Sequence, residues 1–582
     1  MYLKLIKIKN FRKIRKARCF LNCGLNLIIG PNDSGKTAII DAIRLVLKQI
    51  VDDYFRINEE DFRDKTREIN IDLTFSFNDC KTEDELIKQT AFFAEYLSFT
   101  KIDCPELRVW FSVKSNDNDI KFPTFKVGPT KNVAVDMDAR CKENLKVVYL
   151  RPLRDVENEL KAKQGSRISK ILNKHKDIID HKQDLIKCLK DFKDASEDFF
   201  SKGSGKGIKE EIDRLLKDFD EQGHIQKKDI KFGPTENLDC LKTLEKLALY
   251  YENLPRPGLG TLNMIFIAAE LLHLNIQPEP KLLLVEEIEA HLHPQRQLKI
   301  IKSLQKESQK GVQMILTTHS PNLASVIEVN RLNICYNGKF YSLAKGKTKL
   351  EKENYVYLAR FLDVTKANLF FAQGVILVEG PTEQLLIPEF AKIIGYDLTD
   401  YGISVISTNN LGFDHFINIF KRVKSPHNKI PIAFITDADK KNKTKMDAYT
   451  AEMNDINNHV GCFIGEQLYS DQEIDVGKKT TFEKIIFNNT TKLKDIYIQT
   501  YNDLKTREKN ATSGMTTERL YEKMCDEKAL IAQQVTQKLS DIQQCTDETL
   551  KNELKTEIES NLKYMVNAIN FVIPKEELSP VI

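Results

Sequence analysis

Eight residues near the start of the chain have the types and spacing of a phosphate-binding loop. Residues 30–37 read GPNDSGKT, which matches GxxxxGK[ST], and a short buried-strand pattern at 26–29 (NLII) precedes them. In such a loop the glycines let backbone N–H groups face the phosphates, the lysine neutralises phosphate oxygens, and the last hydroxyl binds Mg²⁺. Apolar residues at helical spacing follow, so the phosphates would also meet a helix N-terminus. The sequence therefore predicts an ATP and Mg²⁺ site that includes Asn32, Gly35, Lys36 and Thr37.

A second motif supplies the acids that such a loop needs. Residues 281–287 (KLLLVEE) have the pattern of a buried strand that ends in acids. Glu286 would hold the Mg²⁺ shell, and Glu287 would polarise the attacking water. Residues 314–321 (MILTTHSP) form another strand pattern, and His319 follows it. An isolated histidine is usually structural, but one that ends a strand of the same sheet is placed to sense the γ-phosphate. These residues favour an ATPase.

Carboxylates end two further strands in the second half of the chain. Residues 374–380 (GVILVEG) carry Glu379, and residues 430–439 (IPIAFITDAD) carry Asp437 and Asp439. Because sites in open parallel sheets form outside the carboxyl ends of the strands, we expect these three side chains to converge. Clustered carboxylates without Cys or His select Mg²⁺ or Mn²⁺. The alternative is two unrelated strand ends whose acids cap helices or pair with lysines.

Taken together, these motifs resemble a known family. Residues 9–12 (KNFR), the loop at 30–37, EEIEAHLHP at 286–294 and TTHSP at 317–321 resemble the ABC-type ATPases of the RecF/SMC group. The resemblance is strongest to the OLD (overcoming lysogenisation defect) family, in which a Toprim domain follows the ATPase. It implies that Arg12 lies near the nucleotide and that a signature motif sandwiches ATP between two heads. Residues 257–263 (PGLGTLN), which include Gly260, occupy the signature position but depart from the usual LSGGQ.

The same resemblance implies a two-metal nuclease site. Glu383 matches the acid on the first Toprim helix, and Glu483 matches the acid of a threonine–hydrophobic–glutamate motif. Two ions would clamp the scissile phosphate, one activating water and the other stabilising the leaving oxygen. Family members also use a lysine about twenty residues before a final FxVP motif, here residues 571–574. Lys555 is the candidate by this count, and Lys551 and Lys563 stay open as alternatives.

The strands and helices that carry these motifs predict an α/β fold class. By the resemblance, an ABC-type P-loop ATPase head with a helical insertion comes first, and a Toprim α/β domain with a helical insertion of its own follows. The segment at 158–250 is rich in Lys, Asp and Glu with apolar residues at helical spacing. It resembles a dimerisation arm, although a solvated helical insertion remains possible. The expected divisions are 1–157 and 251–345 for the ATPase halves, 158–250 for the arm, and 346–582 for the Toprim domain with its insertion at about 488–560.

Composition restricts the class of protein but leaves its partner open. Lys and Arg number 88 and Asp and Glu 84, and the resulting charge of +4 does not by itself indicate nucleic acid. The eleven cysteines form no CxxC pair, which favours a reducing cytoplasm. No apolar run approaches the ~20 residues that span a bilayer. We therefore expect a cytoplasmic protein without a membrane partner.

The motifs and the resemblance lead to one main hypothesis. It is a homodimeric or larger ATPase that controls a metal-dependent Toprim endonuclease acting on DNA, in anti-phage defence or DNA metabolism. A Gabija-type arrangement, in which such a nuclease pairs with a UvrD-type helicase, is one specific form of it. The alternative is a nucleotide-gated DNA-binding or scaffold ATPase that does not cut. Whether ATP hydrolysis drives cutting or bound ATP restrains it stays open.

Overall fold

The computed structural model describes most of the chain, with gaps. The described residues are 1–49, 57–78, 82–101, 104–116, 119–120, 122–151, 172, 176–208, 210–212, 258–276, 281–409, 412–437, 450–464, 481–505, 521–524, 527–545 and 547–574. Asp439 and much of the predicted arm at 158–250 lie outside them. No described helix is both long and apolar enough to cross a membrane.

A largely antiparallel sheet forms one layer of the ATPase head. Its order is β11-β10-β7-β5-β1-β2, and β6 pairs with β7. In β1 the apolar residues alternate with lysines, so one face is buried and the other meets solvent. The strands are β1 (Tyr2–Phe11), β2 (Ile14–Phe20), β5 (Ile69–Ser76), β6 (Leu97–Lys101), β7 (Cys104–Val113), β10 (Thr124–Gly128) and β11 (Val135–Asp136).

The second sheet of the head carries the nucleotide motifs. Its order is β16-β15-β3-β14-β13-β12-β4, and its pairs are parallel except for the hairpin β15–β16. Its central strands are buried on both faces, which explains their continuous apolar runs. The strands are β3 (Leu25–Ile29), β4 (Lys48–Gln49), β12 (Lys146–Leu150), β13 (Leu282–Val285), β14 (Gln313–Thr317), β15 (Leu332–Tyr336) and β16 (Lys339–Ser342).

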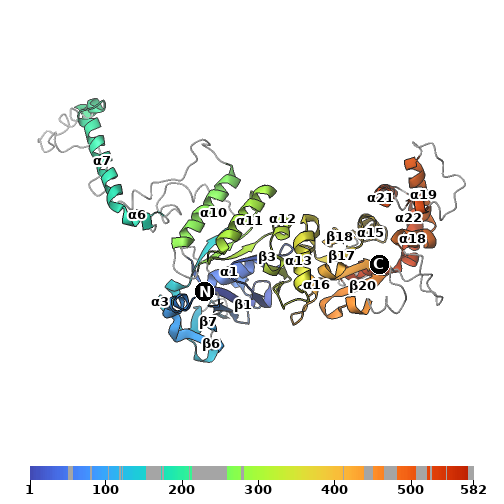
Figure 1. Cartoon of the computed structure of the whole chain (residues 1–582), viewed down its shortest axis with the longest axis horizontal. Helices are drawn as coiled ribbons and strands as arrows, with labels where there is room; N and C mark the ends of the chain where they lie inside the picture. Colours follow the sequence, from blue (N-terminus) through green and yellow to red (C-terminus); the bar gives the residue numbers. More distant parts are fainter. Residues whose placement is uncertain are drawn as a thin grey trace.

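Several helices belong to the head or extend from it (Figure 1). They are α1 (Lys36–Val46), α2 (Glu83–Thr90), α3 (Ala139–Asn144), α10 (Leu259–Ile276), α11 (Pro294–Ser308) and α12 (Pro321–Val326). The described part of the predicted arm is helical, with α6 (Lys176–Asp180) and α7 (Lys182–Ser201). α7 has no buried residue, and it stands apart from the two sheets in Figure 1.

The second half of the chain is built on a four-stranded parallel sheet of order β18-β17-β19-β20. Its strands are β17 (Gly374–Val378), β18 (Ile403–Ser407), β19 (Ile432–Thr436) and β20 (Val460–Ile464). Its helices are α15 (Pro381–Ile393), α16 (Phe413–Phe420), α18 (Phe482–Asn489), α19 (Lys492–Lys505), α21 (Lys528–Gln544), α22 (Glu548–Asn561) and α23 (Lys563–Val572). This arrangement agrees with the predicted α/β fold class, because each half of the chain has its own largely parallel sheet with helices around it.

The helices of the predicted second insertion at about 488–560 share the core of this sheet. Ile376 of β17 belongs to the same buried cluster as Leu493, Ile531 and Leu554, which come from α19, α21 and α22. These helices therefore cover the sheet and its first helix α15, and in the described residues they do not stand apart as a separate unit.

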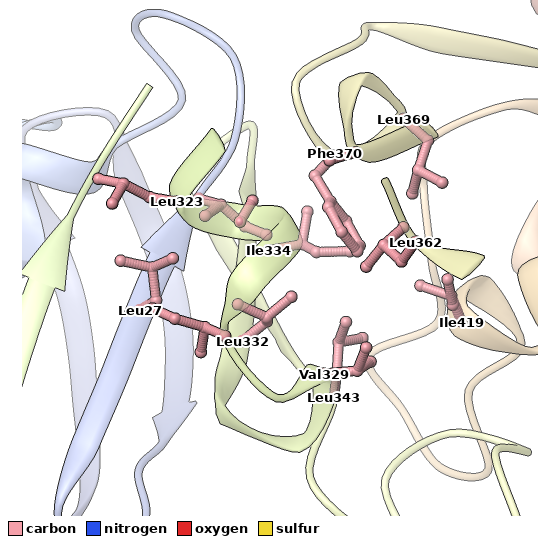
Figure 2. Packing of buried hydrophobic residues seen from close by; sticks show 14 of the residues in the cluster. Leu27, Leu323, Val329, Leu332, Ile334, Leu343, Leu362, Leu369, Phe370 and Ile419 are labelled. Carbon is pink, nitrogen blue, oxygen red and sulfur yellow. The ribbon is translucent and has the colours of Figure 1, made fainter. Parts of the chain in front are cut away.

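The ATPase head and the Toprim sheet are joined by a continuous apolar core. The connecting helices are α13 (Lys352–Phe361) and α14 (Val364–Ala367). Figure 2 shows Ile334 of β15 beside Phe370, with Leu362 and Ile419 on the Toprim side. A close-packed core transmits displacement rather than absorbing it. β15, the strand next to the phosphate-binding loop, thus packs in the same core as residues of the Toprim half.

Candidate functional site

The loop at 30–37 has the geometry of a phosphate cradle. It leaves the buried strand β3 and enters α1, and the backbone φ is +146° at Gly30 and +112° at Gly35. A Cβ at Gly30 would lie 2.1 Å from the carbonyl oxygen of Cys335, so only glycine fits there. The Lys36 ammonium donates hydrogen bonds to the carbonyl oxygens of Gly30 (2.8 Å) and Pro31 (2.7 Å). Burial lowers the pKa of Lys36 to about 8.

The other predicted loop residues face solvent at this cradle. Asn32 is exposed in the turn, and Thr37 is exposed in the first turn of α1. A hydroxyl at this place can reach a metal ion that is held beside the phosphates. The predicted binding residues of the loop thus surround the N-terminus of α1.

Glu286 lies at the carboxyl end of β13, buried in the head. Its Oε2 accepts a hydrogen bond of 2.8 Å from the Tyr149 hydroxyl, while its Oε1 is buried and has no hydrogen-bond partner among the described residues. Burial raises the pKa of Glu286 to about 7. An orphaned carboxylate oxygen in a buried site suits a cation, because a cation would compensate the lost hydration.

Glu287 and His319 lie on neighbouring strand ends. The exposed Glu287 adopts a φ of +46°. Glu289 accepts hydrogen bonds from the Thr318 hydroxyl (2.7 Å) and the His319 N–H (2.6 Å), which links the loops after β13 and β14. Burial, and next the charge of Lys36, lower the pKa of His319, so its imidazole is neutral at pH 7 and can donate one hydrogen bond. Sequence reasoning did not assign Glu289 a role.

The remaining predicted nucleotide residues are placed by specific contacts. Gly260, in the first turn of α10, lies so close to the loop after β13 that a Cβ would sit 2.6 Å from the carbonyl oxygen of His291. Arg12 pairs with Asp41 of α1 (2.6 Å) and with Asp61 (2.8 Å). The structure thus anchors the Arg12 side chain on α1, the helix that starts at the phosphate cradle.

The predicted acids at the carboxyl edge of the Toprim sheet do come together in part. Glu379, after β17, accepts hydrogen bonds through Oε1 from the Thr436 hydroxyl (2.5 Å) and from the Asp437 N–H (2.8 Å). These bonds hold the ends of β17 and β19 side by side. Ser407, at the end of β18, donates to the Glu379 carbonyl oxygen at 3.3 Å. Three neighbouring strands therefore present polar groups at one edge, as the rule for parallel sheets predicts.

Glu383 and Glu483 are buried beside this edge. Glu383, in the first turn of α15, accepts a hydrogen bond of 3.1 Å from the Gly380 N–H. Burial raises the pKa of Glu383 to about 7, with smaller contributions from the charges of Glu483 and Glu379. Glu483, in the first turn of α18, has Lys528 of α21 3.7 Å away. Helices α15, α18 and α21 thus converge with a lysine facing buried acids.

Two buried tyrosines lie among these acids. Burial raises the pKa of the Tyr497 phenol, and the charges of Glu483 and Glu383 raise it further. Burial and the charge of Asp437 likewise raise the pKa of Tyr564. The Tyr497 hydroxyl has no hydrogen-bond partner among the described residues. Neither tyrosine, nor Lys528, was identified from the sequence, because each lies on a different helix from the acids and no local motif marks it.

The types of the candidate ligands suit a hard divalent cation, although the described side chains lie apart from one another in this structure. All the described candidates are carboxylates, the ligand type that Mg²⁺ and Mn²⁺ prefer. Within the described residues, no three His, Cys, Asp or Glu side chains are close enough to hold a metal ion as they stand. Asp439 lies outside the described residues. Lys555 is half-buried on α22, and whether it reaches the acids stays a prediction.

Comparison with known proteins follows the same division of the chain. The family model described as the AAA ATPase domain matches residues 1–324, which is more than half of the chain. The chain belongs to this family. The model described as the overcoming lysogenization defect protein-like TOPRIM domain matches residues 370–439, which hold Glu379, Glu383 and Asp437. The predicted combination of an ATPase with an OLD-type Toprim domain is confirmed.

Relatives that are named as nucleases match most of the chain. Endonuclease GajA of Bacillus cereus (strain VD045) is 25% identical over 529 residues, 81% of this chain and 88% of that protein. Old nuclease of Escherichia phage P2 is 23% identical over 70% of this chain and 72% of its own length. OLD nuclease of Thermus scotoductus (strain ATCC 700910 / SA-01) is 23% identical over 75% and 82%. The chain is thus similar to nucleases along both of its halves.

Proposed function

We propose that the protein is an ATP-regulated DNA endonuclease that depends on Mg²⁺ or Mn²⁺. The observation that carries the proposal is the edge of the Toprim sheet, where Glu379 is bonded to the end of the strand that carries Asp437, with buried Glu383 and Glu483 beside it. Buried acids with few cations around them are costly unless a cation is bound. The similarity to nucleases named GajA and OLD supports the same proposal.

The nuclease residues have distinct roles in this proposal. Glu379, Glu383, Asp437, Asp439 and Glu483 would hold the ions. When bound, two divalent ions activate a water molecule and stabilise the leaving oxygen of a phosphodiester. The Thr436 hydroxyl and the Asp437 N–H keep Glu379 oriented, and the Lys528 ammonium can approach a phosphate from the solvent side because its side chain is 45% exposed. Lys555 is the alternative catalytic lysine.

The ATPase residues would control this edge through the shared core. Lys36, with the backbone N–H groups of its loop, would bind the phosphates, and Thr37 and Glu286 would hold Mg²⁺. Glu287 would orient the attacking water, and neutral His319 would contact the γ-phosphate. The strand next to this loop, β15, packs into the core that continues into the Toprim half. Arg12 and Gly260 would complete the nucleotide site in an assembled dimer.

Cleavage of supercoiled and linear DNA tests the proposal. Purified protein is incubated with Mg²⁺ or Mn²⁺, with and without ATP, beside Asp437→Ala. Asp503→Ala is the matched control, because Asp503 is a surface acid of the same domain that pairs with Lys538. We expect metal-dependent cutting by the parent and by Asp503→Ala, and none by Asp437→Ala. Equal cutting by all three would remove the carboxylate edge from the reaction.

The alternative function is a nucleotide-gated DNA-binding scaffold that does not cut. Absence of cutting under every condition, together with DNA binding that depends on ATP, would support the scaffold. A Lys36→Ala variant gives the sign of ATP control. If bound ATP restrains the nuclease, this variant cuts at ATP concentrations where the parent is silent.

Assembly and biological role complete the proposal. Since the resemblance places ATP between two heads, we propose a homodimer or a higher homo-oligomer, which light scattering of the purified protein tests directly. We further propose a cytoplasmic role in anti-phage defence or DNA metabolism, with a UvrD-type helicase as a candidate partner. Co-purification of such a helicase, and loss of phage resistance in a strain carrying Asp437→Ala, are the corresponding tests.

A further inference from the structure

The side chain that holds the buried Glu286 carboxylate is Tyr149, from the adjacent strand β12. The Tyr149 hydroxyl donates a 2.8 Å hydrogen bond to Oε2 of Glu286. The other oxygen, Oε1, is left buried and without a hydrogen-bond partner among the described residues. We propose that Tyr149 is a positioning residue that turns Oε1 of Glu286 toward the Mg²⁺ of bound Mg-ATP. This inference deepens the nucleotide part of the proposed function and rests on it.

The Tyr149 ring is itself fixed to the helix that carries the other proposed Mg²⁺ ligand. The Arg44 guanidinium lies over the ring, 3.8 Å from its centroid, and pairs with Asp41 at 2.6 Å. Both residues belong to α1, whose first turn holds Thr37. The side chain that holds Glu286 is therefore in contact with the helix that carries Thr37, so the two proposed ligands of one metal ion are supported by a common network.

The backbone supports the same arrangement. The Glu286 N–H donates to the carbonyl oxygen of Leu150 at 3.1 Å, and Leu150 is the last residue of β12. Glu286 is thus held at its backbone by Leu150 and at its carboxylate by Tyr149, both from one strand. Asp41 also pairs with Arg12, so the network that steadies Tyr149 reaches the arginine that the resemblance places near the nucleotide.

The network has the features of a metal site with its supporting shell. Outer hydrogen-bond partners orient metal-binding carboxylates, and their removal typically lowers metal affinity by roughly 10-fold to 100-fold. Glu286 is only 7% exposed, so bulk solvent has little access to its carboxylate. A Tyr149→Phe variant removes only the hydroxyl, because the ring would keep its contact with Arg44.

The test measures binding of a fluorescent, non-hydrolysable ATP analogue while Mg²⁺ is varied. Tyr149→Phe is compared with the parent and with Tyr341→Phe. Tyr341 is also buried in this head, but its hydroxyl, unlike that of Tyr149, has no hydrogen-bond partner among the described residues. We expect the Mg²⁺ concentration for half-maximal enhancement of binding to rise about 10-fold to 100-fold in Tyr149→Phe. Binding without Mg²⁺ should stay near the parent value, and Tyr341→Phe should behave as the parent.

Two outcomes would overturn the inference. One is an unchanged Mg²⁺ requirement in Tyr149→Phe. The other is an equal loss of analogue binding with and without Mg²⁺, which would make Tyr149 a structural support of the loop. A Glu286→Gln background sharpens the test, since Tyr149→Phe should have little further effect on the Mg²⁺ requirement there. The assay contains no DNA, so a failure of the proposed nuclease function would leave its result interpretable.

Discussion

The strongest quantitative prediction concerns Glu383→Gln. Glu383 is 7% exposed, and its pKa is about 7 in the folded protein against an ordinary value of 4.5. The folded state therefore keeps a proton that the unfolded chain loses between these two pKa values, so stability falls as the pH rises through this window. At pH 8, ionisation of Glu383 lowers the free energy of unfolding by about 3 kcal/mol. This value is an upper limit, because the raised pKa is partly a property of the neighbouring acids as well. At pH 5 it is only about 1 kcal/mol.

Glu383→Gln should therefore stabilise the metal-free protein at pH 8 while it removes metal-dependent cutting. The amide can still accept the hydrogen bond from the Gly380 N–H, so the start of α15 is preserved. We expect the melting temperature in EDTA at pH 8 to rise on the order of 5 °C, and the gain to shrink markedly at pH 5. Calorimetry at both pH values, with Mn²⁺ titrated in a parallel series, measures the effect.

Glu389→Gln is the matched control. Glu389 lies on the same helix and is also 7% exposed, but it pairs with Lys392 at 3.1 Å. Its substitution should give no stabilisation at pH 8, because it removes the partner of a cation. Two results would contradict this reasoning. One is a melting temperature of Glu383→Gln at or below that of the parent at pH 8, and the other is an equal rise of the melting temperature in both glutamine variants. Either result would mean that ionised Glu383 does not destabilise the folded protein.

Three further predictions follow from the contacts above. Lys528→Ala should reduce DNA cutting and move the pH dependence of cutting to higher pH, because Lys528 lowers the pKa of Glu383. A cleavage assay over pH 6–9 measures this shift, and Lys555→Ala should not produce it. Gly30→Ala should abolish ATP binding, since its Cβ would lie 2.1 Å from a carbonyl oxygen of β15, whereas Gly311→Ala, at a positive φ with open space around it, should still bind ATP. Phe370→Ala should lower the free energy of unfolding by about 3–5 kcal/mol. Because both halves share the core that contains Phe370, calorimetry should show one unfolding transition at a lower temperature. Two separate transitions, of which only one moves, would contradict this.

The phosphate-binding loop and the two Toprim strands could be predicted from the sequence because their causes are local. Gly30 is required by a backbone approach that no other residue allows, and the spacing of Lys36 and Thr37 follows from the turn into α1. Strands β13 and β17 are buried on both faces, so each appears in the sequence as an apolar run that ends in an acid. Motif and burial pattern together fix such elements without knowledge of the fold.

The partners of these acids were decided only by the tertiary structure. Tyr149 lies 137 positions from Glu286 along the chain, yet β12 pairs with β13 and brings the phenol to the carboxylate. Lys528 reaches Glu483 because α21 packs on α19, which in turn packs on α18, the helix that carries Glu483. Many other lysines in that region have equal claim in the sequence. The helices at about 488–560 look polar and inserted in the sequence, but their apolar stripes complete the Toprim core. A sequence specifies which groups can do chemistry; which of them meet depends on long-range strand pairing and helix packing, which short-range periodicity does not encode.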